Sequence, residues 1–363
     1  MDSLSIASDP AALTPAWLTE ALRASGELGD EVAVTEVDLA PVGTGQMCDS
    51  IRVHLTYDGA PDSAPATLVA KLPAADTTSR ETAKSLGSYE KEVRFYQQLA
   101  GGLPVRTPRC LYADIDVADA DFVLLLEDMA PAEQGDQLAG CPPEQAEVAV
   151  AELVKLHAPR WDDPTLGQLE WLHRDPEAGR MFLSQLLPML HEGFRERYAD
   201  RLSPEAAGAC DALFASLGGY IGRDPGPVTV AHGDYRLDNL LFGGHGGGVP
   251  VAVVDWQTVT LGPALTDVAY FIGAGLVPDD RRAHEDRLVH RYHDDLVAAG
   301  VGGYGWDRCW EDYRRGTWAG LVMAVAASML VERTERGDEM FMTMAERHAL
   351  HALDLDAVEL LRT

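Results

Sequence analysis

The stretch from Thr229 to Gln257, TVAHGDYRLDNLLFGGHGGGVPVAVVDWQ, combines apolar segments with polar residues that an ordinary strand would exclude. Asp234 and Asn239 share one short loop, and Asp255 directly follows a run of valines. A carboxylate in apolar surroundings costs free energy unless a cation meets it. The stretch therefore indicates either a functional site or an internal polar network.

Phosphoryl transfer accounts for this combination of residue types. The reaction needs a carboxylate that receives or orients the acceptor hydroxyl, and oxygen ligands for magnesium that bridges nucleotide phosphates. The protein-kinase signature is H-R-D-x-x-x-x-N followed by D-F-G, and this chain has HGDYRLDN followed by DWQ. The alternative is that Asp234 and Asn239 are ordinary turn-forming residues.

The glycine run at 243–248 is predicted to be a hairpin loop between the strands NLLF and VPVAVVDW. It lacks both the lysine and the following helix of a phosphate-binding P-loop. The chain has no G-x-S-x-G or H-E-x-x-H motif, which argues against the commonest serine hydrolases and zinc proteases.

The N-terminal half has the pattern of a sheet. After a helix capped by Thr14, strand patterns follow at 33–39, 51–57, 66–73, 109–114 and 121–129. Alternation assigns Ala33, Thr35, Val37 and Leu39 to one face of the first strand. A single helix at 88–100 is inserted after the third strand, and Glu92 shares its apolar face. We expect a five-stranded, mostly antiparallel sheet.

Helical periodicity dominates from residue 141 onward. The helical patterns run to about 188 and then cover 204–217, 284–299 and 306 to the end. A strand-rich half followed by a helix-rich half predicts an α+β, bilobal fold with lobes at 1–128 and 129–363 and a cleft for the acceptor.

Composition narrows the classes of partner and compartment. The 363 residues carry a net charge of −29, which argues against nucleic acid or an anionic membrane as the main partner. Five scattered cysteines favour a reducing compartment, and the N-terminus lacks the pattern of a secretory signal. The apolar segment 317–331 is short for a membrane span. We expect a cytoplasmic protein with no membrane span.

The paired motif resembles the Brenner motif of the aminoglycoside phosphotransferase and choline kinase superfamily, which are relatives of protein kinases that act on small molecules. LVAKL, EKEVRFYQQL, LLLEDM and LVKLHAPRW occur in the expected order, so the resemblance covers about residues 37–271. HGDYRLDN with DWQTVTLGPALTDVAYF is most similar to the kinase-like domains found with acyl-CoA dehydrogenases and to ecdysteroid-kinase-like proteins. The resemblance implies a protein-kinase-like fold and a phosphotransferase that uses ATP or GTP with Mg²⁺.

The resemblance also implies roles for residues of the quoted stretch. Asp234 matches the catalytic aspartate, and Asn239 and Asp255 match the metal ligands. His232 is expected to brace the loop, and Asp267 to tether it or to cap the following helix. Arg236 and Asp238 are interpreted as loop-facing, although Arg236 could also touch the substrate.

For the nucleotide, the resemblance implies that Lys71 holds the phosphates and pairs with Glu92. The backbone from Glu127 to Met129 would meet the adenine, and Gly43 and Gly45 would cover the phosphates. The alternatives are that Lys71 is a solvated strand lysine and that Glu92 pairs with a nearby arginine.

Three departures from the family pattern affect this interpretation. Gly233 replaces the arginine that receives an activation-loop phosphate in many protein kinases, which argues against that form of regulation. Gln257 stands where many relatives carry a second acid, and VGTGQM differs from G-x-G-x-x-G.

The expected reaction is phosphorylation of a hydroxyl on a small molecule. An apolar, sterol-like or hydroxyacyl acceptor is preferred over an aminoglycoside, because the helical half carries Trp306, Trp310, Trp318, Met323, Met329, Met340, Met342 and Met344. The other hypotheses are an aminoglycoside kinase, a non-catalytic nucleotide-binding scaffold, and a hydrolase that uses the same acids and metal.

Overall fold

The computed structural model describes residues 4–43, 47–59, 64–172, 176–198, 200–222, 225–243 and 250–361. Two compact units make up the chain. The sheet unit comprises Met1–Gly102, Thr107–Pro131 and Asp255–Gln257. The helical unit comprises Leu103–Arg106, Ala132–Val254 and Thr258–Thr363.

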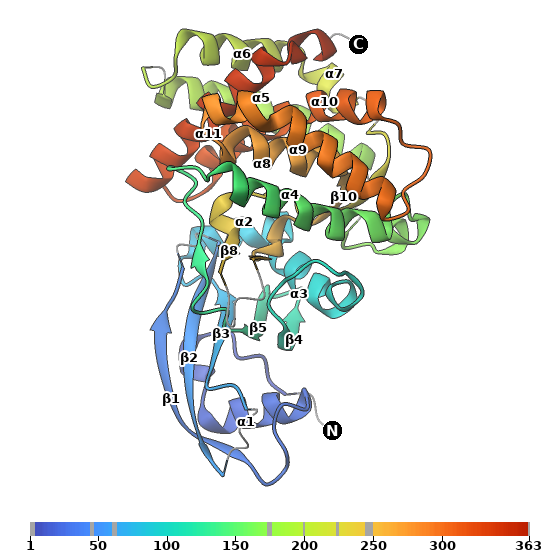
Figure 1. Ribbon diagram of the computed structural model, residues 1–363. Helices are drawn as coiled ribbons and strands as arrows, with labels where there is room; N and C mark the ends of the chain where they lie inside the picture. Colours follow the sequence, from blue (N-terminus) through green and yellow to red (C-terminus); the bar gives the residue numbers. More distant parts are fainter. Residues whose placement is uncertain are drawn as a thin grey trace. The chain divides into compact units, whose positions relative to one another are not determined.

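The sheet unit contains a five-stranded antiparallel sheet in the order β1-β2-β3-β5-β4 (Figure 1). Its strands are β1 (Ala33–Pro41), β2 (Cys48–Asp58), β3 (Thr67–Pro73), β4 (Cys110–Asp116) and β5 (Asp121–Glu127). Helix α1 (Pro15–Ala24) begins as the sequence predicts, because the Thr14 side chain accepts from the backbone N–H of Trp17 and Pro15 occupies the first turn. The predicted number and direction of the strands are confirmed.

Two predictions for this unit are wrong. A β-bulge between Val34 and Glu36 shifts the register of β1, so Val34 is buried and Thr35 is exposed. Two helices rather than one follow β3, namely α2 (Thr77–Leu86) and α3 (Ser88–Gln98). The first was missed because it buries only Ser79 and Ala83 and so has little apolar periodicity.

The helical unit is built from eight α-helices in the described part of the chain. They are α4 (Pro143–His157), α5 (Pro176–Tyr198), α6 (Pro204–Ala215), α7 (Leu217–Gly222), α8 (Ala264–Gly275), α9 (Pro278–Ala298), α10 (Trp306–Leu330) and α11 (Glu335–Asp354). The predicted helix boundaries differ in several places, including the start of α9, which lies at Pro278 and not at residue 284. Helix α5 continues through Pro188, and the region after 306 is divided into two helices.

Among the residues described, five short strands accompany these helices. They are β6 (Glu133–Gln134), β7 (Val228–Ala231), β8 (Leu240–Phe242), β9 (Val251–Val253) and β10 (Thr260–Pro263). The predicted antiparallel pair β8–β9 is confirmed, and the glycine run at 244–248 between them lies outside the described residues. The pair β7–β10, which the sequence analysis missed, brackets the quoted stretch and fixes both its ends.

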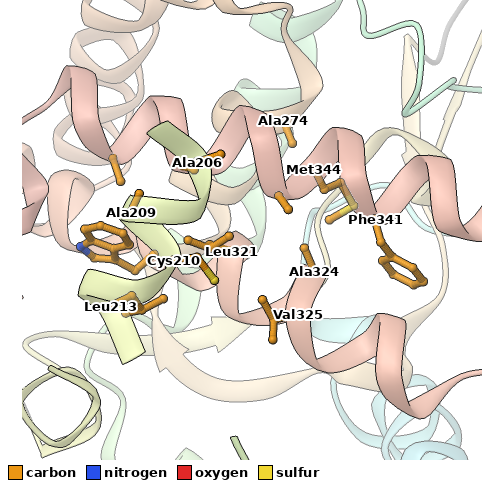
Figure 2. Close-up of a cluster of buried hydrophobic side chains, with 14 of the residues drawn as sticks. Ala206, Ala209, Cys210, Leu213, Ala274, Leu321, Ala324, Val325, Phe341 and Met344 are labelled. Atoms are coloured by element: carbon orange, nitrogen blue, oxygen red, sulfur yellow. The ribbon is translucent and has the colours of Figure 1, made fainter. Parts of the chain in front are cut away.

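A hydrophobic core of the helical unit lies among α6, α8, α10 and α11, as Figure 2 shows. Most of the aromatic and thioether side chains that favoured an apolar acceptor belong to this core: Trp318, Met340, Met342 and Met344 are buried in it, and Met323 and Met329 pack against it. They therefore stabilise the fold. No described helix has the length and apolar character needed to cross a membrane.

Candidate active site

The predicted pair of Lys71 and Glu92 is present in the sheet unit. Lys71 lies on β3, on the face opposite Leu68, Ala70 and Leu72, and its Nζ is 2.6 Å from Glu92 Oε1 of α3. The Glu92 side chain has no exposed surface. Burial and the negative charge of Asp255 raise the pKa of Glu92, although Lys71 opposes the shift.

Asp255 is the second carboxylate at this lysine. Its Oδ1 lies 3.1 Å from Lys71 Nζ, and its φ of 66° is a left-handed conformation that non-glycine residues rarely adopt. The next residue, Trp256, stacks on Phe95 with ring centroids 3.8 Å apart, and its backbone N–H faces Glu92 Oε1 at 3.3 Å. This packing fixes Trp256, the residue directly after Asp255.

Burial lowers the pKa of Lys71, but the charges of Asp255 and Glu92 outweigh it and raise the pKa well above the usual value. Lys71 is thus a fixed cation between two carboxylates. The alternative of a solvated strand lysine is wrong, because the Lys71 side chain is only 9% exposed.

The residues expected to meet the base and phosphates of a nucleotide lie at strand ends of the sheet unit. Glu127 ends β5, where its backbone N–H donates to Arg109 O at 2.8 Å, and Met129 is buried two residues later. Gly43 follows β1 with a φ of +80°, which only glycine adopts readily. Gly45 lies outside the described residues.

The loop at residues 232–239, named the catalytic loop after its predicted role, belongs to the helical unit and follows β7. The Asp234 carboxylate, 17% exposed, lies at its centre. Asn239 donates from Nδ2 to the backbone oxygen of Asp234 at 2.8 Å and to its Oδ2 at 2.9 Å. The loop therefore closes on itself, with the two predicted functional side chains in direct contact.

Arginine side chains neutralise this loop, which the sequence analysis missed. Arg236 donates from Nε to Asp234 Oδ2 at 3.0 Å and from Nη1 to Asp238 Oδ2 at 2.7 Å. Arg336 of α11 donates to the other oxygen of Asp238 at 3.2 Å. Burial alone would raise the pKa of Asp238, but the two arginines lower it. The spacing of Arg236 from Asp234 was visible in the sequence, whereas the approach of Arg336 was not.

Asp267 on α8 ties down the start of the loop. Its carboxylate accepts from the backbone N–H of His232 at 2.6 Å and from that of Gly233 at 2.9 Å. Burial raises the pKa of Asp267, but hydrogen bonding to His157 and to these groups lowers it overall. Of the two predicted roles, tethering is present and capping is not, because α8 has no side-chain cap.

His232 braces the loop as predicted. Its ring nitrogens lie 3.0 Å from the backbone oxygen of Val254 and 3.3 Å from the backbone N–H of Asp234. Tyr270, also on α8, donates from its hydroxyl to Asp234 Oδ1 at 2.6 Å. Sequence reasoning missed this contact because a tyrosine in an apolar helix has the pattern of an ordinary core residue.

The oxygen donors present suit magnesium better than zinc. Within the described ranges, no group of three or more His, Cys, Asp and Glu side chains gathers as a zinc site would require. Magnesium in phosphotransferases is usually held by one or two protein ligands, phosphates and water. The Asn239 amide nitrogen donates to Asp234, and its amide oxygen is the atom that could bind a metal ion. The Asp255 side chain is 36% exposed.

Residues 58–311 of the chain match the phosphotransferase enzyme family, APH. Two curated relatives match more locally. Acyl-CoA dehydrogenase family member 11 of Gallus gallus is 26% identical over 174 residues, which are 47% of this chain and 21% of that protein. Acyl-CoA dehydrogenase family member 10 of Mus musculus is 48% identical over 51 residues, 14% of this chain and 5% of that protein. The matches thus span about a fifth or less of the relatives' length.

Solved structures share the fold at low sequence identity. Choline kinase of Cryptosporidium parvum has a TM-score of 0.57 at 9% identity, over 88% of this chain and 89% of that one. Ethanolamine kinase of Plasmodium vivax has a TM-score of 0.51 at 11% identity, over 93% and 89%. The GDP and kanamycin complex of APH(2'')-IIIa has a TM-score of 0.51 at 14% identity, over 87% and 95%.

These likenesses confirm the predicted kinase-like α+β fold. The match to the family extends over more than half of the sequence and includes Lys71, the catalytic loop and Asp255. The prediction of an enzyme of the small-molecule kinase class is confirmed at the level of the family. The chain belongs to the phosphotransferase enzyme family.

Proposed function

We propose that the chain transfers the terminal phosphoryl group of ATP or GTP, bound with Mg²⁺, to a hydroxyl of a small molecule. The observation that carries this proposal is the group of side chains at Lys71. One buried ammonium contacts two carboxylates, Glu92 and Asp255, and the Asp255 side chain is 36% exposed. An ammonium can contact phosphates, and carboxylate oxygens are the ligands that magnesium prefers.

In the proposed reaction, the acceptor oxygen forms a bond to the terminal phosphorus while the bond between that phosphorus and the nucleoside diphosphate breaks. The acceptor proton passes to the Asp234 carboxylate. The products are a phosphomonoester and a nucleoside diphosphate. The hydrogen bond from Arg236 Nε to Asp234 Oδ2, at 3.0 Å, orients this carboxylate.

We assign Asn239 and Asp255 as the protein ligands of magnesium and Lys71 as the group that contacts the phosphates. Magnesium would neutralise and bridge the phosphate oxygens. The Glu127–Met129 backbone, Gly43 and Gly45 are proposed to contact the nucleotide.

For the acceptor, we favour an uncharged or largely apolar alcohol, including hydroxyacyl compounds, over a polycationic aminoglycoside. The core position of Trp318 and of the methionines weakens one reason for this preference. The charges of the loop supply another: Asp234 and Asp238 are matched by Arg236 and Arg336, so the loop has no excess negative charge to attract a polycation. The names of the curated relatives also direct attention to acyl compounds.

The test is ADP release with Mg²⁺ and a panel of acceptors, with mass spectrometry to detect the gain of one phosphate. The panel contains hydroxy fatty acids, hydroxyacyl-CoA, a sterol, choline, ethanolamine and kanamycin. Asp234→Asn is the matched control. Phosphorylation of kanamycin alone would overturn the acceptor class and leave the kinase intact. Thermal stabilisation by ATP without turnover on any acceptor, water included, would favour the non-catalytic scaffold.

A further inference from the structure

Helix α8 contacts the catalytic loop at two points, and the second contact is made by a tyrosine. Asp267 and Tyr270 are three residues apart, so they lie on the same side of the helix. Asp267 binds the backbone N–H groups of His232 and Gly233. Tyr270 donates its hydroxyl to Asp234 Oδ1 at 2.6 Å. The helix thus fixes both the backbone of the loop and the carboxylate at its centre.

We propose that Tyr270 is a positioning residue for phosphoryl transfer, whose hydroxyl sets the direction in which Asp234 accepts the proton of the acceptor. This inference rests on the proposed function, in which Asp234 is the proton acceptor.

The hydrogen bonds of Asp234 show why the tyrosine matters. A carboxylate has about four acceptor positions. Oδ2 accepts two hydrogen bonds, from Arg236 Nε at 3.0 Å and from Asn239 Nδ2 at 2.9 Å. Oδ1 accepts one, from Tyr270. Among the described residues these donors leave one acceptor position, and it is on Oδ1. The oxygen that Tyr270 holds is therefore the one available to the acceptor hydroxyl.

The surroundings of Tyr270 keep its hydroxyl in place. The side chain is 2% exposed and lies in the core of the helical unit. Its ring packs against that of His348 at a centroid distance of 5.3 Å. A Cβ added at Gly273 or Gly320 would collide with the His348 ring. The absence of a side chain at these two glycines therefore makes space for the imidazole that packs against Tyr270. Burial and the charge of Asp234 raise the pKa of Tyr270 well above its usual value, which keeps it a donor.

The chain offers a matched control. Tyr198 of α5 is also buried in this core, and its hydroxyl donates to Asp338 Oδ1 at the same distance, 2.6 Å. Tyr198→Phe removes the same kind of hydrogen bond as Tyr270→Phe, from a carboxylate outside the catalytic loop. Melting curves of both variants report any general loss of stability.

The experiment measures ADP release from Mg-ATP with water as the acceptor, and with any alcohol that the panel identifies. We expect Tyr270→Phe to lower kcat about 10- to 100-fold with the KM for ATP changed less than twofold, because only proton acceptance is misdirected. Tyr198→Phe should retain wild-type kcat. In an Asp234→Asn background, Tyr270→Phe should have no further effect, because the two residues act as one unit.

Two outcomes would overturn the inference and leave the proposed function standing. In the first, Asp234→Asn loses turnover whereas Tyr270→Phe stays within twofold of wild type. In the second, the losses of the two single variants multiply in the double variant. If Asp234→Asn retains wild-type turnover, or if the wild type releases no ADP, the proposed function itself fails and the inference fails with it.

Discussion

Lys71 Nζ lies 2.6 Å from Glu92 Oε1, a carboxylate with no exposed surface, although the two residues come from a strand and a helix 21 positions apart. Removing one member of a buried pair leaves the other charged and unpaired, which costs more than the pair itself contributes. The same lysine also forms an ion pair with Asp255. In the proposed function, this one side chain therefore contributes both to stability and to nucleotide binding.

We expect Lys71→Ala to lower the free energy of unfolding by about 3 kcal/mol and to weaken nucleotide binding and turnover together. Urea unfolding and calorimetry with Mg-ATP measure the two effects. The double variant Lys71→Met with Glu92→Met is the control, since it leaves no unpaired charge at Glu92 and should recover much of the stability but none of the activity. Unchanged binding and turnover in Lys71→Ala would show that this lysine does not contact the nucleotide.

Asp255→Ala should abolish the magnesium dependence of ATP binding. The phosphates would then lose their bridging cation on the protein side, so the affinity in Mg²⁺ should fall toward the affinity measured in EDTA. Calorimetry of wild type and variant with and without Mg²⁺ makes the comparison. Equal ATP affinities under all four conditions would contradict the metal assignment.

Gly233→Ala should slow turnover, and Gly233→Arg should not restore any function of the arginine found in protein kinases. Gly233 has a φ of +81°, and a Cβ there would lie 2.6 Å from the backbone oxygen of Thr258. The loop must therefore shift, which moves the neighbouring Asp234. We expect at least a tenfold loss of kcat for either variant. Gly300→Ala, at a φ of +98° in open space on the helical unit, is the control for backbone strain alone.

The helical unit should lose stability below about pH 6.5, because His348 is buried and uncharged. Burial lowers the pKa of its imidazole well below the usual value, and the nearby positive charges of Arg347 and Arg281, together with His351, add to the shift. Above the pKa that His348 has in the unfolded chain, its imidazole is neutral in both the folded and the unfolded chain, so stability is retained. As the pH falls below it, the unfolded chain binds a proton that the folded chain excludes.

This difference predicts a loss of up to about 1.4 kcal/mol per pH unit from His348. Tyr270 of α8 is the titratable group that faces the ring across the helix contact, and it stays uncharged in this range. Urea midpoints at pH 7.5 and 5.5 measure the slope. His348→Leu should reduce it, and substitution of the exposed His54 by Gln should not. An equal slope in His348→Leu would contradict the assignment.

Much of the sheet unit could be predicted from the sequence because its side chains alternate or repeat with a clear period. The spacing of Glu92 with Phe95 and Tyr96 predicted a buried carboxylate, and all three are buried. The bulge at Val34 could not be predicted from the sequence. One extra residue in a strand reverses which side chains face the core, and it leaves the composition of the strand unchanged. Helix α2 was missed because the residues it buries, Ser79 and Ala83, are small and form no apolar stripe in the sequence.

The candidate site was predictable where its residues are close in sequence and was not where they are distant. Asp234 and Asn239 share one loop, and their contact follows from the local turn. Arg336 reaches Asp238 across 98 positions, and Tyr270 reaches Asp234 across 36. Neither contact leaves a pattern in the sequence, because an exposed arginine and a buried tyrosine are common on any helix.

The three residues Asp255–Gln257 belong to the sheet unit, although the chain on both sides of them belongs to the helical unit. A fragment that stops at Pro131 would lack Trp256 and would leave the face of Phe95 without its stacking partner. Chimeras made by joining the first part of one relative to the second part of another would pair Phe95 with a foreign tripeptide. Recombination within this family therefore has to exchange that tripeptide together with the strands it packs against, and no single crossover point achieves this.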